Sequence, residues 1–133
     1  MEHEIPHLAL SARRPWAWAL FYAGKDLENR DWRPTNPRLK QRGWIAIHAS
    51  NGMTKAYYQE AAAYMRDRLG IICPGPQDLP RGRIVGSVVI IDLVTKSDSP
   101  WFFGPYAFVL RDARPCSFRP ASGMLGFFKW ERS

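Results

Sequence analysis

Residues 43–49 read Gly-Trp-Ile-Ala-Ile-His-Ala, and this alternating stretch decides the fold class. Successive side chains of a strand point to opposite faces of a sheet, so the stretch predicts a strand with two distinct faces. One face carries Trp44, Ala46 and His48, and the other carries Ile45, Ile47 and Ala49.

Outward from this strand, the next long apolar run extends from Ile84 to Val94. Its β-branched residues are typical of a buried strand. Gly86 within the run predicts a bulge or the close approach of another backbone. Apolar content and alternation predict further strands at residues 5–11, 106–111 and 125–130.

Two helices are predicted between these strands. Pro15 stands where the first would begin, since its missing N–H costs nothing in a first turn, and Gly24 ends that run. The second runs from about Lys55 to Leu69, with Thr54 as its cap. Its apolar stripe consists of Tyr58, Ala61, Ala62, Met65 and Leu69. Few helices and no regular strand–helix alternation predict an α+β domain, a closed or nearly closed β-barrel of about five or six strands with peripheral helices.

Length and composition limit the class of protein. The chain has 133 residues, 46% hydrophobic and 23% charged, which fits one folded domain over residues 1–133. No apolar run approaches the roughly 20 residues that span a bilayer, and Met1-Glu2-His3-Glu4 does not start a signal peptide. Cys73 and Cys116 are too few for a disulfide framework or a four-ligand zinc site. These features predict a reduced, cytoplasmic protein without metal or cofactor and without a membrane partner.

The charge balance is basic and dominated by arginine. There are 14 Arg and 5 Lys against 12 Asp plus Glu, so the net charge is 19 − 12 = +7. Arginine forks suit phosphates, and the chain also has 18 aromatic residues that can stack on bases. Both features have a plainer explanation, because excess charge keeps small domains soluble and most aromatic residues lie in cores. Composition alone leaves both interpretations open.

The densest chemistry lies at residues 25–32, Lys-Asp-Leu-Glu-Asn-Arg-Asp-Trp. If this stretch is extended, Glu28, Arg30 and Trp32 project to one side and line a pocket wall beside Lys25. A lysine that loses water there can serve as a base or nucleophile. Glu28 is a candidate to orient it or to accept from a base edge, and Trp32 to stack. The alternative is a lysine that complements the helix dipole and a solvated Glu28–Arg30 pair.

The spacing of these residues resembles a family signature, Gly-x-Lys-x-x-Glu-x-Arg. Lys25, Glu28 and Arg30 match, and Ala23 replaces the glycine. Further segments match in order: Leu10–Ala17, Ile45–Ser50, Pro80–Gly86 and Pro100–Tyr106. From about residue 8 to residue 130, the chain resembles the ASCH domain, a branch of the PUA-like superfamily.

The resemblance implies a PUA-like β-barrel with a cleft beside the first helix that bears the Lys, Glu and Arg. Members are associated with recognition of RNA or modified nucleosides. One small bacterial member removes the acetyl group from N4-acetylcytidine with a Lys, a Thr three residues later and a distant Glu. Lys25 matches that Lys, and Glu28 stands in place of the Thr. Asp92 and Asp98 are the nearest acidic candidates for the distant Glu.

Further residues are candidates for the same cleft. Ser11 and Arg14 flank the start of the first helix, where an anion can bind. His48 either points into the cleft or bonds a neighbouring backbone group. Of the aromatic residues Trp101, Phe102, Phe103 and Tyr106, at least one stacks over the cleft, or all of them plug the open end of the barrel. The predicted catalytic residues are Lys25 and Glu28, and the predicted binding residues are Ser11, Arg14, Trp16, Arg30, Trp32, His48, Ser50, Trp101 and Tyr106.

The leading hypothesis is binding of RNA or of a modified, cytidine-type nucleoside. The alternative is an amidohydrolase that deacylates N4-acetylcytidine-like compounds with Lys25 as base or nucleophile. A metal-independent ribonuclease that uses Lys25 and His48 comes third, and a partner-recruiting module with an empty cleft comes fourth.

Overall fold

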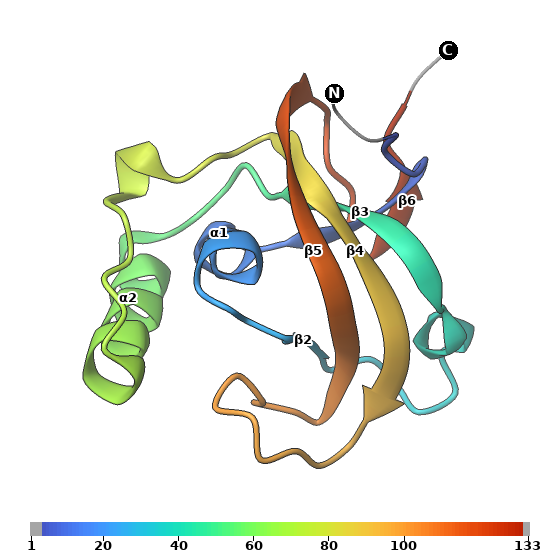
Figure 1. Ribbon diagram of the computed structural model, residues 1–133, viewed down its shortest axis with the longest axis horizontal. Helices are drawn as coiled ribbons and strands as arrows, with labels where there is room; N and C mark the ends of the chain where they lie inside the picture. Colours follow the sequence, from blue (N-terminus) through green and yellow to red (C-terminus); the bar gives the residue numbers. More distant parts are fainter. Residues whose placement is uncertain (1–3, 132–133) are drawn as a thin grey trace.

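The computed structural model describes residues 4–131, which form one curled sheet and two α-helices (Figure 1). Met1, Glu2 and His3, on which the expectation about the N-terminus rests, lie outside the described residues. The strands are β1 (Leu8–Ala12), β2 (Leu27–Arg30), β3 (Gly43–Ala49), β4 (Arg83–Val94), β5 (Tyr106–Pro120) and β6 (Phe127–Lys129). The helices are α1 (Arg14–Tyr22) and α2 (Lys55–Leu69), with short 3-10 turns η1 (Pro37–Lys40) and η2 (Pro76–Asp78).

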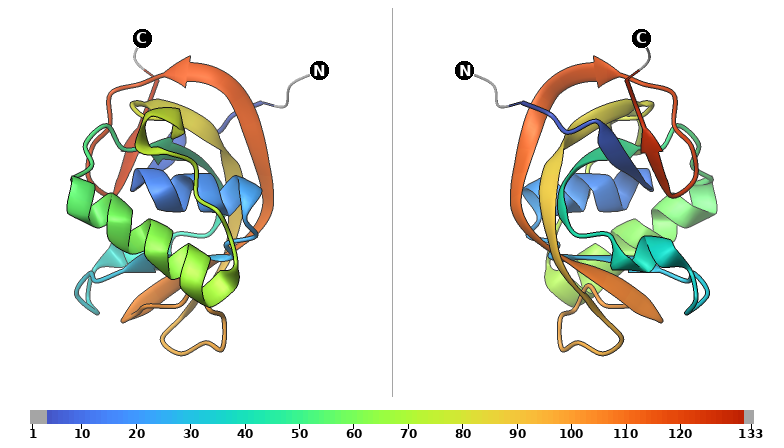
Figure 2. Two further views of the ribbon diagram at one scale, coloured as in Figure 1. Left: turned by 90° about the vertical axis from the view of Figure 1, so that its left-hand side faces the viewer. Right: turned by 90° about the vertical axis from the view of Figure 1, so that its right-hand side faces the viewer.

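Within residues 4–131 the sheet has the order β2-β5-β4-β3-β1-β6, in which β1 and β3 are parallel and all other neighbours are antiparallel. The long strands β4 and β5 curve around α1, and α2 lies beyond α1, away from the sheet (Figure 2). The α+β prediction is confirmed, in the form of a six-stranded half-barrel with two helices. The edge strands β2 and β6 do not pair with each other in the part of the chain that the structure describes.

Side chains bridge the seam between the two edges. The ring of Trp32, just after β2, lies 5.8 Å from that of Phe127 in β6, and both contact Phe108 of β5. Arg30 at the end of β2 donates to the backbone oxygen of Ser11 in β1 at 2.6 Å. Side chains therefore close the seam. The contacts of Arg30 and Trp32 hold residues 25–32 against β1 and β6.

The alternation of β3 is confirmed. Ile45 and Ile47 are fully buried in the main core together with Leu20 of α1. Ala46 lies in a second cluster on the other side of the strand, with Phe128. Burying both faces explains why β3 occupies an interior position in the sheet.

Local signals place both helices where the sequence predicts them. Pro15 lies in the first turn of α1. The hydroxyl of Thr54 caps α2 by accepting from the backbone N–H of Tyr57 at 3.1 Å, and Gly70 ends α2 with φ +68°. No helix among residues 4–131 combines the length and apolar content needed to cross a bilayer.

Gly86 confirms the predicted close approach inside β4. A Cβ atom there would lie 2.4 Å from the backbone oxygen of Arg114 and 2.5 Å from the ring of Phe21. Only glycine leaves room for β5 on one side and α1 on the other.

Candidate functional site

A cleft of about 880 Å³ opens beside the first turns of α1 and α2, with β2 along one wall. We call it the Lys25 cleft. Its polar residues include Lys25, Glu28 and Arg30, and its aromatic residues are Trp16, Trp32, Tyr57 and Phe103.

The backbone after α1 directs Lys25 into this cleft. Gly24 has φ +73°, a left-handed conformation that turns the chain. The backbone N–H of Lys25 then donates to Ala19 at 3.1 Å. The following strand, β2, pairs with β5, so Glu28 and Arg30 project to the same side by the two-residue period.

Three polar side chains form one network in the Lys25 cleft. Nζ of Lys25 donates to Oε1 of Glu28 at 2.8 Å and to the backbone oxygen of Leu27. Oε2 of Glu28 lies 3.5 Å from Nη2 of Arg30. The same Arg30 nitrogen donates to Ser11, which fixes the guanidinium against β1. The carboxylate of Glu28 is therefore held between two cations.

This network is withdrawn from water. The exposed fractions of the side chains are 1% for Lys25, 6% for Glu28 and 18% for Arg30. The alternative of a solvated Glu28–Arg30 pair is therefore wrong. Interactions of buried charges are screened less than those of exposed ones, so this carboxylate presents a fixed negative group to whatever enters the cleft.

Aromatic rings flank the network. Nζ of Lys25 lies 5.9 Å from the ring centroid of Trp16, within the range of a cation–π contact. The guanidinium of Arg30 lies 5.5 Å from the ring centroid of Trp32. The ring of Phe103 lies 5.6 Å from that of Trp16. The cleft thus combines flat apolar walls with a charged group beside them.

Tyr57 supplies a hydroxyl at the α2 side of the cleft. The indole Nε1 of Trp16 donates to this hydroxyl at 2.7 Å, and the guanidinium of Arg13 lies 4.5 Å from the tyrosine ring centroid. Burial is the main cause that raises the pKa of Tyr57 above its usual value. The hydroxyl keeps its proton near neutral pH and can donate it to a ligand.

Two predicted serines also line the Lys25 cleft. The hydroxyl oxygen of Ser50 is buried and has no hydrogen-bond partner within the described chain. Ser11 contributes its backbone oxygen to Arg30. A buried hydroxyl without a partner is costly, so Ser50 is a candidate to bond a ligand.

His48 does not line the cleft. Its Nε2 donates to the backbone oxygen of Ala121 at 2.8 Å, and its ring packs against Phe128 at 5.5 Å. Of the two interpretations, the structure therefore shows the histidine bonded to a backbone group. Burial lowers its pKa, and the bond to Ala121 opposes this in part. A ribonuclease site that combines Lys25 with His48 would need both residues in one cleft, whereas the Lys25 cleft contains Lys25 without His48.

Trp101, Tyr106 and Arg14 also lie outside the Lys25 cleft. Trp101 is 4% exposed and packs with core residues of α1 and α2, while Tyr106 packs against the main core. The loop of residues 100–106, which we call the aromatic loop, therefore packs into the core through Trp101 and faces the cleft through Phe103. Arg14 is buried rather than exposed, and its Nη2 donates to the backbone oxygen of Pro76 at 2.5 Å.

Sequence reasoning missed Tyr57, Arg13 and Asn29, which also line the cleft, and it left open which ring of the aromatic loop faces the cleft, the place that Phe103 takes. Asn29 holds the aromatic loop in place, because its Oδ1 accepts from the backbone N–H groups of Phe103 at 2.8 Å and Gly104 at 3.1 Å. The signal for this role in the sequence is an amide side chain within the polar stretch of residues 25–32, where it can bond the backbone of a neighbouring loop. Tyr57 gave none beyond its place in the first turn of α2.

Neither acidic candidate for a third catalytic group reaches the cleft. Asp92 accepts from the backbone N–H of Leu93 at 2.8 Å and is exposed, and Asp98 is also exposed. Glu28 and Asp31 are the carboxylates that line the cleft among residues 4–131. No group of three or more His, Cys, Asp or Glu residues in that range is arranged to hold a metal ion.

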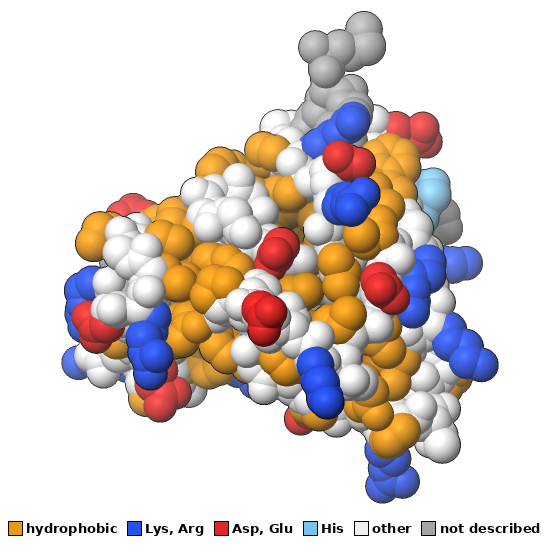
Figure 3. Space-filling view, turned by 60° about the horizontal axis from the view of Figure 1, so that its bottom comes forward, with side chains coloured by type: hydrophobic (Ala, Val, Ile, Leu, Met, Phe, Trp, Pro, Cys, Tyr) orange, Lys and Arg blue, Asp and Glu red, His pale blue; other side chains and the backbone are white. Residues whose placement is uncertain are grey.

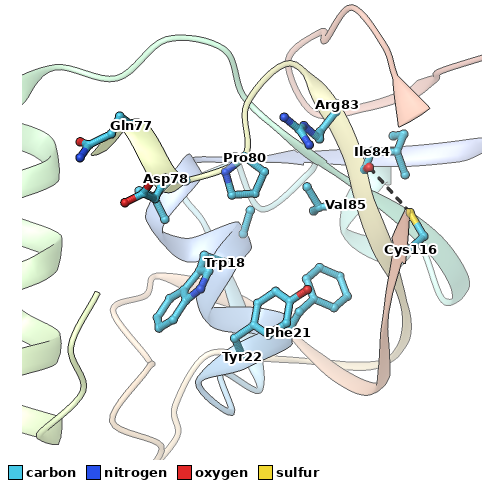
Figure 4. A pocket seen from close by; sticks show the side chains of 12 residues that line it. Trp18, Phe21, Tyr22, Gln77, Asp78, Pro80, Arg83, Ile84, Val85 and Cys116 are labelled. Atoms are coloured by element: carbon cyan, nitrogen blue, oxygen red, sulfur yellow. Dashed lines mark hydrogen bonds between the residues drawn. The ribbon is translucent and has the colours of Figure 1, made fainter. Parts of the chain in front are cut away.

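A separate hollow of about 410 Å³ lies against another part of α1 (Figure 4). Trp18 and Tyr22 form one side of it, and Arg83, Val85 and Cys116 line the other. The thiol of Cys116 donates to the backbone oxygen of Ile84 at 3.7 Å. None of the predicted catalytic residues and none of the binding residues predicted for the Lys25 cleft lines this hollow.

On the face shown in Figure 3, acidic and hydrophobic side chains lie between scattered Lys and Arg side chains.

A comparison with known proteins found no matching family model and no similar curated sequence. The family resemblance rests on the motif residues themselves.

Proposed function

We propose that this chain is an ASCH-type, PUA-like domain that binds a cytidine-type base, from RNA or from a modified nucleoside, in the Lys25 cleft. The observation that carries the proposal is the buried Lys25–Glu28–Arg30 network beside the rings of Trp16 and Trp32. Flat rings beside a fixed hydrogen-bonding group are what recognition of a single base requires.

Glu28 is the specificity-determining group in this proposal. A carboxylate has about four acceptor positions, and the contacts of Glu28 with Lys25 and Arg30 use two of them. The exocyclic amine of cytosine is such a donor, and acidic side chains accept from it in base recognition. Stacking tolerates any ring, so selectivity depends on this bond.

Hydrolysis of N4-acetylcytidine is the second candidate, and it is supported only by the burial of a lysine in the cleft. Against it, the amine of Lys25 is engaged with Glu28 and Leu27. A nucleophile needs a free lone pair, which an ion-paired ammonium lacks. Binding therefore has the better support.

Calorimetric titration with cytidine, N4-acetylcytidine and short single-stranded RNA tests the proposal. In the variant Glu28→Gln, affinity for cytosine-containing ligands is expected to fall at least about tenfold, which corresponds to the loss of about one hydrogen bond to a charged group. Glu60→Gln makes the same chemical change at an exposed position of α2 and is expected to bind as the wild type does.

Chromatography of the same mixtures separates binding from turnover. Unchanged N4-acetylcytidine with measurable binding supports the proposal. Release of cytidine by the wild type, abolished in Lys25→Met, would replace it with the amidohydrolase. Absence of any binding, or equal affinity of Glu28→Gln and wild type, would contradict recognition by Glu28.

A further inference from the structure

A second pocket adjoins the Lys25 cleft. It has a volume of about 520 Å³ and shares Met53 and Thr54 with the cleft as lining residues. Three cationic side chains line it, namely Arg14, Lys55 and Arg81, and no Asp or Glu of the described residues does. We call it the basic pocket.

Arg14 is the most informative residue of the basic pocket. It is 6% exposed, so it is more than nine-tenths buried. Its Nη2 donates to the backbone oxygen of Pro76, but its Nε is buried and has no hydrogen-bond partner in the part of the chain that the structure describes. No carboxylate within residues 4–131 lies within ion-pair distance of it. A buried charge without a counter-charge is unfavourable, so Arg14 is incomplete without an anion.

Burial and the neighbouring Arg81 both disfavour the charged form of Arg14. Burial lowers the pKa of Arg14, and the positive charge of Arg81 lowers it further. Both effects mean that the charged guanidinium lies in a disfavoured environment, which a bound anion would relieve.

The N-terminus of α2 also favours an anion in the basic pocket. Thr54 caps this 15-residue helix, and its oxygen satisfies the N–H of Tyr57. The first N–H groups of a helix otherwise have no intrahelical partner, and the helix dipole favours negative charge there. Because Thr54 lines both hollows, an anion at this helix start lies next to the Lys25 cleft.

We infer that the basic pocket binds the phosphate of a nucleotide whose base occupies the Lys25 cleft. This inference rests on the proposed function and narrows it, because the ligand is then a nucleoside phosphate or a residue of RNA rather than a free nucleoside. Arg14 and Arg81 bind phosphate oxygens, and the base lies beyond Thr54 against the aromatic wall.

Calorimetric titrations with inorganic phosphate, cytidine, cytidine 3′-monophosphate and cytidine 5′-monophosphate test the inference. At least one monophosphate is expected to bind about tenfold more tightly than cytidine or more. Arg81→Ala is the principal variant, because Arg81 is exposed and its truncation removes no buried side chain. It is expected to reduce monophosphate affinity to that of cytidine and to leave cytidine affinity unchanged.

Arg68→Ala removes an exposed arginine from the last turn of α2 and serves as the matched control. It is expected to leave every affinity unchanged. Equal affinity of cytidine and both monophosphates, or equal effects of Arg81→Ala and Arg68→Ala, would overturn the inference.

The failure of the proposed function has a different signature. Inorganic phosphate would then bind and be lost in Arg81→Ala, while Glu28→Gln would leave monophosphate affinity unchanged. That result would support an anion site in the basic pocket and would overturn the proposal that a base binds in the Lys25 cleft.

Discussion

The ammonium nitrogen of Lys25 lies 2.8 Å from Oε1 of Glu28, and both side chains are almost completely buried. Removing two charges from water costs several kcal/mol per ion, and their attraction only partly offsets this cost. A buried pair is therefore weak support for stability alone. Its position beside an open cleft is better explained if the pair fixes Glu28 for recognition.

Unfolding measurements on Glu28→Leu and Lys25→Met test the arrangement of this pair. Glu28→Leu leaves Lys25 and Arg30 without their carboxylate and is expected to cost about 3–5 kcal/mol. Lys25→Met is expected to cost less, because Arg30 still lies 3.5 Å from Glu28. Urea denaturation gives both values, and a larger loss for Lys25→Met than for Glu28→Leu would contradict the described network.

Two neighbouring aromatic residues are expected to behave in opposite ways. Trp101→Ala removes a buried ring and is expected to lower the free energy of unfolding by about 3–5 kcal/mol. Phe103→Ala is expected to cost less stability, since Phe103 is 49% exposed. Its loss is expected to weaken ligand binding by about 1–3 kcal/mol if the ring stacks on a base. Thermal denaturation and titration of each variant separate these roles, and the reverse assignment would exclude Phe103 as the stacking wall.

His48 is expected to make stability depend on pH. Burial holds its pKa in the folded protein below that in the unfolded chain, which is near 6.5. Above the unfolded pKa both states are neutral. As the pH falls through the window between the two values, the unfolded chain binds more protons and the folded protein loses stability.

The variant His48→Gln isolates this effect, because a glutamine amide can donate to Ala121 but does not titrate. From about pH 7.5 to about pH 5, the wild type is expected to lose more stability than His48→Gln. Chemical denaturation at the two pH values measures the difference. Equal losses in both proteins would show that the His48 ring is accessible to water.

Gly86→Ala tests the contact between β4 and its neighbours. The new Cβ would overlap the backbone of Arg114 and the ring of Phe21, so a loss of at least about 1–3 kcal/mol is expected. Gly52→Ala is the control, because its Cβ would meet no atom of the described residues within 4 Å. It is expected to change stability by less than about 1 kcal/mol, and urea midpoints compare the two. Equal effects would mean that β5 can move away from β4 at no cost.

Much of the fold follows from local signals. Alternation predicts β3, and Thr54 and Gly70 mark the ends of α2. The grouping of Lys25 with Glu28 also follows locally, because a turn at Gly24 and the two-residue period of a strand suffice to place both.

The length of β5 does not follow from local signals. The sequence predicts a strand that ends at Arg111, but β5 continues to Pro120. Asp112 has φ +54° and the pairing with β4 shifts register, which lets Pro115 remain in a strand. Among the described residues, β2 covers β5 only as far as Leu110, so a proline beyond that point lies on an edge where no partner needs its N–H.

The orientations of Arg14 and His48 were not predictable either. Their partners, Pro76 and Ala121, lie 62 and 73 residues away along the chain. Such contacts depend on the tertiary arrangement and leave no periodic signal. The choice between Trp101 and Phe103 is of the same kind, since residues of an irregular loop follow no fixed alternation of faces.

The most direct test of the central claim, that a base binds in the Lys25 cleft, is an NMR titration of the tryptophan indole N–H groups with cytidine monophosphate. Trp16 and Trp32 line the cleft, whereas Trp18 lines the other hollow and serves as an internal control. We predict saturable shifts of the Trp16 and Trp32 resonances with no change at Trp18. Unchanged Trp16 and Trp32 resonances at the highest ligand concentration, or a shift at Trp18 alone, would contradict the account.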